Sequence, residues 1–131
     1  MIPANVKKVF EENLWFVATC SDEPHVIPVG FKGITEDGKF TIGAVLLETT
    51  LKNIEKNGKI AVAACDPNTM ESYQMKGTAE FVTEGPVFDQ YVKLAEDTFK
   101  GAHPAKGALV ITPDRIIVAS PSEQNKQEIP M

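Results

Sequence analysis

Two threonines and a lysine in the middle of the chain have the residue types and spacing to bind an anion. A predicted strand ends in Ile42-Gly43-Ala44, and Thr49, Thr50 and Lys52 then stand at the predicted start of a short helix. Free N–H groups and a partial positive charge at a helix N-terminus favour phosphate. A bound phosphate would also stabilise Lys52, because a cation in the first turn is otherwise unfavourable. The structural alternative is a threonine cap, with Lys52 solvated or paired with Glu48.

A second segment, Pro28-Val29-Gly30-Phe31, could receive a flat ring. Proline removes one backbone donor and glycine removes a side chain, so a ring could approach the main chain closely. Gly43 supports the same idea, because a glycine within a strand often marks the close approach of a ligand or of another backbone. The alternative is a β-bulge at Gly30 and a purely structural Gly43.

No other pattern assigns a catalytic residue. The chain has no Gly-x-Ser-x-Gly, His-Glu-x-x-His or phosphate-binding P-loop motif. Cys20 and Cys65 lie in apolar segments, so we expect buried, unbridged thiols of low reactivity. We expect His25 and His103 at the surface, and no metal site, because two histidines without a neighbouring cysteine do not form a structural zinc pattern.

Composition excludes several classes of protein. The 131 residues are 43% hydrophobic and 24% charged, as in one globular domain. The net charge is −5 and the only arginine is Arg115, which argues against binding nucleic acid. No apolar run has the length of a membrane span, and no leader pattern begins the chain, so we expect a cytoplasmic protein. We expect one domain over residues 1–131, with the polar residues 121–131 as a C-terminal arm.

Hydrophobic periodicity predicts a mainly β fold with three peripheral helices. The helices are expected at residues 4–13, from Thr49 or Thr50 to Asn57, and from Pro86 through Phe99. The strands are expected at residues 14–20, 25–32, 40–44, 59–65, 73–82, 108–111 and 116–119, the last two forming one strand or a pair. Tight turns such as Asp37-Gly38 favour an antiparallel sheet that closes into a small barrel. The absence of a Gly-x-Gly-x-x-Gly motif disfavours a Rossmann domain.

An ordered set of segments resembles the FMN-binding split-barrel family, the pyridoxamine 5′-phosphate oxidase-like proteins, over residues 4 to 119. The resemblance looks closest to the small stand-alone FMN-binding proteins of that group, and it implies a six-stranded antiparallel split β-barrel. The matching segments are the opening helix, residues 14–20, 24–29, 40–44, 50–54, 59–65 and 75–81, and the ending 109–116.

The resemblance also implies a site and a function. It implies a homodimer with two FMN molecules at the subunit interface, and a phosphate bound at Thr49 and Thr50. The family has a lysine before the short helix that this chain lacks, and Lys52 would take its place. The backbone lining the isoalloxazine ring would be that of Val29, Gly30, Phe31, Ile42, Gly43 and Ala44. The predicted function is that of an FMN-dependent oxidoreductase or electron-transfer protein, acting on a small-molecule substrate or redox partner. The alternative is a non-catalytic binding module for FMN, F420, haem or another small ligand. Residues 121–131 lack the arginine and tryptophan of true pyridoxamine-phosphate oxidases, so we do not predict that activity.

Overall fold

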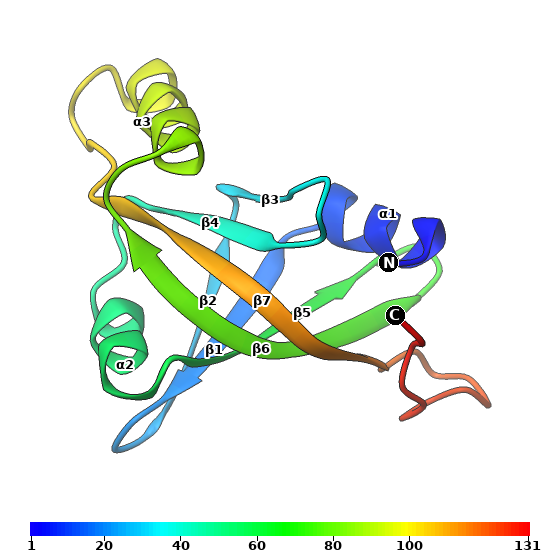
Figure 1. Cartoon of the computed structure of the whole chain (residues 1–131). Coiled ribbons are helices and arrows are strands. Elements are labelled where there is room, and N and C mark those ends of the chain that lie inside the picture. Colours follow the sequence, from blue (N-terminus) through cyan, green and yellow to red (C-terminus); the bar gives the residue numbers. More distant parts are fainter.

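Seven antiparallel strands form one strongly curved sheet in a computed structural model that describes all 131 residues. The strands are β1 Trp15–Cys20, β2 Pro24–Val29, β3 Lys32–Ile34, β4 Phe40–Ala44, β5 Lys59–Cys65, β6 Ser72–Val82 and β7 Gly107–Val118. Their order across the sheet is β2-β1-β5-β6-β7-β4-β3, so the two edge strands are consecutive in the sequence. The sheet wraps into a split barrel, as Figure 1 shows.

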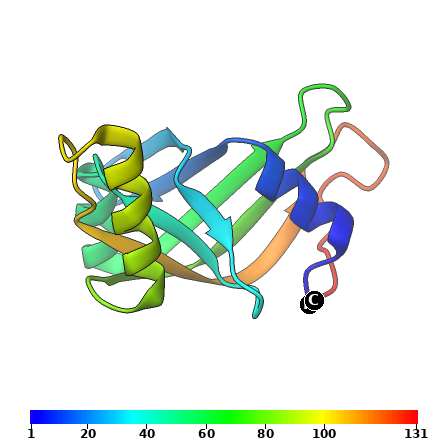
Figure 2. The ribbon, with the colours of Figure 1, turned by 90° about the horizontal axis from the view of Figure 1, so that it is seen from above.

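Three helices surround the barrel. Helix α1 (Ala4–Glu12) covers one end, and α2 (Thr49–Asn57) lies at the other end, as Figures 1 and 2 show from two directions. Helix α3 (Pro86–Phe99) packs on the outside, against β4 and β7. The predicted proline at the start of α3 and the left-handed Gly58 after α2 both occur. The helix bounds thus agree closely with the sequence prediction.

Aromatic side chains fill the barrel beside α1. The ring of Phe10 packs edge-on against Phe40 with 4.9 Å between centroids, and Trp15 lies 5.1 Å from Phe40. Trp15 is fully buried, and its indole N–H donates a 2.7 Å hydrogen bond to the carbonyl of Phe10. Lys32 donates to the carbonyls of Phe10 and Glu11 at 2.8 and 2.7 Å, where a cation complements the C-terminal end of a helix dipole. Burial lowers the pKa of Lys32, and the charge of Glu11 partly opposes that shift.

The sheet has seven strands where six were expected. The segment predicted as one strand over residues 25–32 is divided at Gly30-Phe31, where the chain leaves its partner β1 and joins β4 instead. Strand β7 is continuous through Pro113, because a β-bulge at Asp114 absorbs the proline. Gly77 pairs with Pro113 and Lys76 with Arg115, which leaves Asp114 as the extra residue.

Burial alternates along β1, although its segment is apolar in sequence. Trp15, Val17 and Thr19 face the core, whereas Phe16 and Cys20 are exposed. The prediction of two buried cysteines is therefore wrong for Cys20, and Cys65 is only half-buried; both thiols are free.

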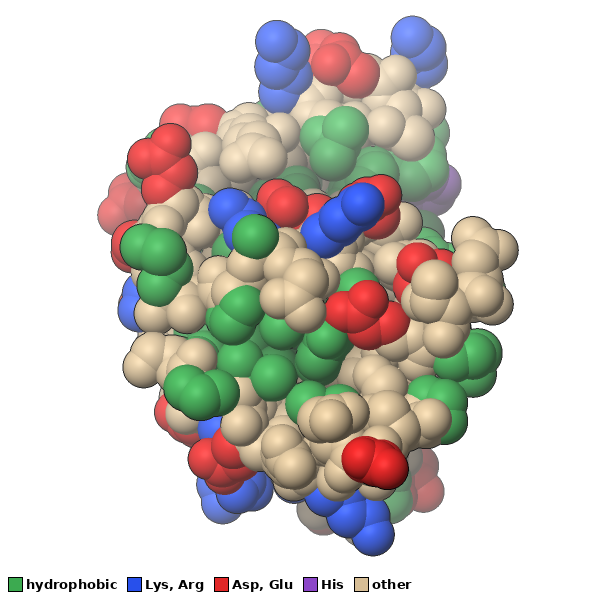
Figure 3. Space-filling view, turned by 90° about the vertical axis from the view of Figure 1, so that its right-hand side faces the viewer, with side chains coloured by type: hydrophobic (Ala, Val, Ile, Leu, Met, Phe, Trp, Pro, Cys, Tyr) green, Lys and Arg blue, Asp and Glu red, His purple; other side chains and the backbone are tan.

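The last residues of the chain fold back on β7. Ile129 donates its N–H to the carbonyl of Ile116 at 2.8 Å, and Val118 donates to Gln127 at 2.9 Å. Both termini lie at this end of the molecule (Figures 1 and 2). In Figure 3 this end faces the viewer, with hydrophobic side chains gathered near the centre and acidic and basic side chains beside and around them. None of the three helices is both long and apolar enough to cross a membrane.

Candidate functional site

Helix α2 begins at the residue that the sequence predicted, but it is not capped by a threonine. The helix begins at Thr49 and Glu48 occupies the N-cap position, so neither threonine caps the helix. No side chain accepts a hydrogen bond from the first turn, and no acidic residue lies within that turn. The N–H groups that a cap would satisfy are therefore available to another acceptor.

Thr50 is the notable residue of this turn. Its side chain is 1% exposed, and its Oγ1 is the buried side-chain polar atom that has no hydrogen-bond partner. Burying a hydroxyl without a partner costs about 1–3 kcal/mol, so proteins rarely retain such an atom without a role for it. The oxygen is closed to solvent.

Lys52 is exposed and makes no ion pair; only its backbone N–H contacts Glu48, at 3.1 Å. The pairing of Lys52 with Glu48, considered as an alternative, is therefore absent. Lys52 and Lys56 line a surface hollow between α2 and the β1–β2 turn. The carboxylates of that hollow come from Asp22, Glu23 and Glu55, so its net charge is not positive.

Both segments predicted to line a ring lie side by side. Gly43 donates its N–H to the carbonyl of Phe31 at 2.9 Å, which joins the end of β4 to the chain between β2 and β3. Gly30 is exposed, and a side chain added there would meet nothing within 4 Å. Val29 is 9% exposed and belongs to the core, so the accessible part of this segment is Gly30-Phe31.

Strand β4 is closed on both faces, which leaves no surface for a ring against it. Ile42 and Ala44 point into the core at 0% exposure. On the other face, a Cβ built on Gly43 would lie 2.6 Å from Cδ1 of Tyr91. The phenol of Tyr91 is itself fixed by a 2.8 Å hydrogen bond with the hydroxyl of Thr41. The close approach at Gly43 is therefore that of an α3 side chain, and the flavin contacts of Ile42, Gly43 and Ala44 stay a prediction.

Desolvation raises the pKa of Tyr91, and the hydrogen bond with Thr41 partly offsets the rise. Tyr73 lies in the barrel core beside α1, and its hydroxyl donates a 2.6 Å hydrogen bond to Glu71. Burial, together with that carboxylate, raises the pKa of Tyr73 to about 12. Both phenols therefore remain protonated at neutral pH and act as hydrogen-bond donors.

The histidines lie where they were expected. His25 is half-buried on the edge strand β2, and His103 is exposed in the loop after α3, with its ring 5.1 Å from that of Phe99. No group of three or more His, Cys, Asp or Glu side chains is arranged to hold a metal ion.

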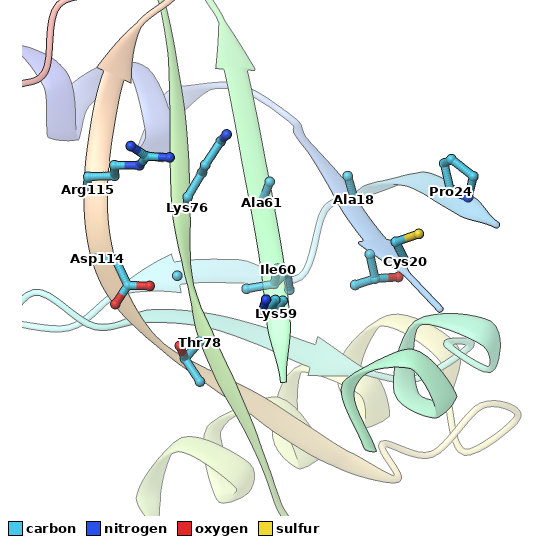
Figure 4. Close-up of a pocket in the computed structure, with 12 residues that line it drawn as sticks. Ala18, Cys20, Pro24, Lys59, Ile60, Ala61, Lys76, Thr78, Asp114 and Arg115 are labelled. Atoms are coloured by element: carbon cyan, nitrogen blue, oxygen red, sulfur yellow. The ribbon is translucent and has the colours of Figure 1, made fainter. Parts of the chain in front are cut away.

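The sequence did not indicate a groove on the outer face of the sheet. It crosses β1, β5, β6 and β7 and has a volume of about 650 Å³. Lys59, Lys76 and Arg115 border it together with Asp114, as Figure 4 shows. These residues are up to 56 positions apart, so only the strand register brings them together. Each of β5, β6 and β7 contributes a single cation, and the sequence does not say which strands are neighbours.

The curved antiparallel sheet and its three helices define a split barrel. A family model described as pyridoxamine 5′-phosphate oxidase matches residues 2–126. The chain belongs to the pyridoxamine 5′-phosphate oxidase family, as the resemblance in its sequence suggested.

Three similar proteins show how far the likeness extends. An uncharacterized protein of Methanocaldococcus jannaschii is 36% identical over 111 residues, which cover 79% of this chain and 71% of that protein. The crystal structure of HupZ from Group A Streptococcus has a TM-score of 0.83 and 27% identity, covering 99% of this chain and 100% of that chain. An FMN-binding protein of Syntrophomonas wolfei has a TM-score of 0.70 at 17% identity, with 90% of this chain and 86% of that chain covered, and it shows the fold alone.

Proposed function

We propose that this protein binds FMN at the start of α2 and serves as a flavin-dependent oxidoreductase or electron-transfer protein. Family membership and the fold shared with the Syntrophomonas wolfei FMN-binding protein support the proposal. The observation that carries it is the unpaired Oγ1 of Thr50 at a helix start that has no side-chain cap. An anion there would satisfy both the hydroxyl and the free N–H groups.

The residues present fit the phosphate of FMN in part. The first turn of α2 supplies N–H donors and a positive dipole, and Lys52 supplies a charge that no carboxylate neutralises. The hollow beside Lys52 also contains three carboxylates, which weaken the attraction for a dianion. We therefore expect recognition by hydrogen bonds from Thr49, Thr50 and the backbone, with a smaller contribution from charge.

The ring of the flavin fits only one of its two expected segments. Gly30 offers exposed backbone with no side chain in the way, whereas Gly43 is covered by Tyr91. We therefore place the ring against Gly30 and Phe31 alone. Phe31 packs 5.8 Å from the ring of Phe99, so the aromatic wall at this point includes the end of α3.

Bound FMN would supply hydride or single-electron transfer. The protein would hold the phosphate, orient the ring and exclude water on the side of Phe31. No residue of the proposed site is assigned as a general acid or base. The C-terminal residues 121–131 contain neither arginine nor tryptophan, so we do not assign pyridoxamine phosphate as the substrate.

We also propose a homodimer. Phe16 is 51% exposed and Val26 is 63% exposed on the neighbouring strands β1 and β2. Large side chains exposed together on a sheet face are typical of an interface. A second copy seated on these strands would lie beside the β2–β3 connection and could complete the wall around the ring.

Fluorescence titration with FMN tests the phosphate site. Losing a hydrogen bond to a charged group costs about 1.5–3 kcal/mol, so Thr50→Ala should weaken FMN binding roughly 10- to 100-fold. Thr98→Ala is the matched control, because Thr98 is exposed on α3 and should leave the affinity unchanged. Equal affinities in Thr50→Ala and the parent protein would place the phosphate elsewhere. Reduction of the bound flavin by NAD(P)H then separates a redox protein from a module that only binds flavin.

A further inference from the structure

Two asparagines attach α2 to the end of β1. Asn53 and Asn57 are one turn apart on the same face of the helix, which lies beside the C-terminal end of β1 (Figure 1). The side-chain amide of Asn53 donates a 3.0 Å hydrogen bond to the hydroxyl of Thr19, and that of Asn57 donates a 2.9 Å bond to the carbonyl of Cys20. Thr19 and Cys20 are the last two residues of β1, so both bonds hold the helix to one point of the sheet.

The two bonds differ in burial and in their local surroundings. Asn53 is 6% exposed and Thr19 is 5% exposed, so their bond is enclosed, whereas the bond from Asn57 lies at the surface. Asn57 also accepts the backbone N–H of Lys59 at 2.9 Å, which is a local role at the end of the helix. Asn53 is in the helix interior, where asparagine is a poorer helix former than leucine. A buried hydrogen bond is directional, unlike apolar packing, so it fixes one arrangement of helix and strand.

The bond between Asn53 and Thr19 lies one turn from the residues proposed for the phosphate. Asn53 follows Thr50 by three positions, so the two residues are neighbours on the helix surface. Asn53 also borders the hollow that Thr49 and Lys52 line. Holding Asn53 against β1 therefore fixes the direction in which the first N–H groups of α2 point. A helix start that moved freely would lose part of its affinity for an anion, because it would have to become ordered on binding.

We propose that Asn53 is a positioning residue of the phosphate site, a role that rests on the function proposed above. Its hydrogen bond with Thr19 holds the start of α2 against β1, so that Thr50 and the backbone N–H groups meet the phosphate in one geometry. Asn53 acts through the helix, and contact with the phosphate is left to Thr49, Thr50 and Lys52.

The ratio of the affinities for FMN and riboflavin tests this role, because the two ligands differ only by the phosphate. The double variant Asn53→Leu/Thr19→Val replaces both partners by apolar groups of similar size, a change that is often nearly neutral for stability. We expect its Tm to stay near that of the parent protein and its affinity ratio to fall about 3- to 10-fold, the value of one hydrogen bond. A merely structural role for Asn53 would leave the ratio unchanged once the Tm is preserved.

Thr19→Val alone removes the same bond from the strand side. Valine has the shape of threonine, so this variant should fold, and its affinity ratio should fall by a similar factor. The ³¹P resonance of bound FMN gives an independent readout, and it should move towards that of free FMN in Thr19→Val. Thr19→Ser keeps the hydroxyl and should keep the ratio of the parent protein.

Asn57→Ala is the matched control, because it removes the surface bond and leaves the buried one in place. Its affinity ratio and ³¹P resonance should equal those of the parent protein. A parent-like ratio in both Thr19→Val and the double variant would overturn the positioning role, as would an equal fall in Asn57→Ala. If Thr50→Ala lowers the ratio in the same series, the phosphate site itself would stand. Equal affinities of the parent protein for FMN and riboflavin would overturn both the positioning role and the phosphate site.

Discussion

Replacing Thr50 with valine should raise the stability of the ligand-free protein while it lowers the affinity for FMN. Valine has the shape of threonine and the same branching at Cβ, so the substitution keeps the packing and the helix rotamer. It removes Oγ1, the buried atom without a hydrogen-bond partner. Replacing a buried polar side chain by an apolar one usually removes a hydrogen bond, whereas this substitution removes only a desolvated hydroxyl without a partner.

The size of the gain follows from the cost of that hydroxyl. Burying a hydroxyl without a partner costs about 1–3 kcal/mol by protein mutational data, so we expect Thr50→Val to stabilise by about 1 kcal/mol. For a chain of 131 residues this corresponds to a rise in Tm of about 3–5 °C. The affinity for FMN should fall roughly 10- to 100-fold, as for alanine.

Thermal unfolding of the ligand-free protein measures the first effect, and flavin fluorescence measures the second. Thr98→Val on the exposed face of α3 is the control, and its unfolding free energy should change by less than about 0.5 kcal/mol. A lower Tm in Thr50→Val would show that Oγ1 has a partner within the fold. A higher Tm with unchanged FMN affinity would confirm the orphaned hydroxyl but refute its role in phosphate binding.

Four further outcomes are expected. Gly43→Val should lower the free energy of unfolding of the ligand-free protein by about 1–3 kcal/mol, because the valine side chain overlaps the ring of Tyr91; adding Tyr91→Ala should recover part of the loss in calorimetry. Lys32→Met removes the two hydrogen bonds from Lys32 to carbonyls at the C-terminal end of α1. It should lower the free energy of unfolding by about 1–3 kcal/mol, as measured by urea unfolding. Ultraviolet titration should show Tyr73 ionising near pH 12 in the folded protein, against a pKa of 10.0 in the unfolded chain. The free energy of unfolding should therefore keep its full value below pH 10 and fall as the pH rises towards 12. Tyr73→Phe should make that fall smaller. Light scattering should give about twice 14.3 kDa, and Phe16→Asp should shift the protein towards the monomer.

Local patterns in the sequence predicted the helices and most strands. Pro86 marks the start of α3, Gly58 ends α2, and Asp37-Gly38 forms the β3–β4 turn, because each fixes backbone geometry within a few residues. The division at Gly30-Phe31 could not be predicted in the same way. It arises because the chain changes partner strands, and local sequence does not specify the partner.

The site was only partly predictable for the same physical reason. The spacing around Thr49 and Thr50 located the start of a helix, which depends on neighbours in sequence. The role of Gly43 depends on Tyr91, which lies 48 residues further along the chain. A glycine in a strand signals a close approach, but the sequence does not say what approaches. Cys20 was assigned to the core because its segment is apolar throughout, whereas the sheet exposes every second residue of β1.

Dissociation constants for FMN and riboflavin test most directly whether the start of α2 recognises the phosphate of FMN. The two ligands share the ring and differ by the phosphate, so the ratio of their affinities isolates that group. We predict that FMN binds about 10-fold or more tightly than riboflavin, and that Thr50→Val removes most of the difference. Equal binding of the two flavins, or binding of neither, would contradict it.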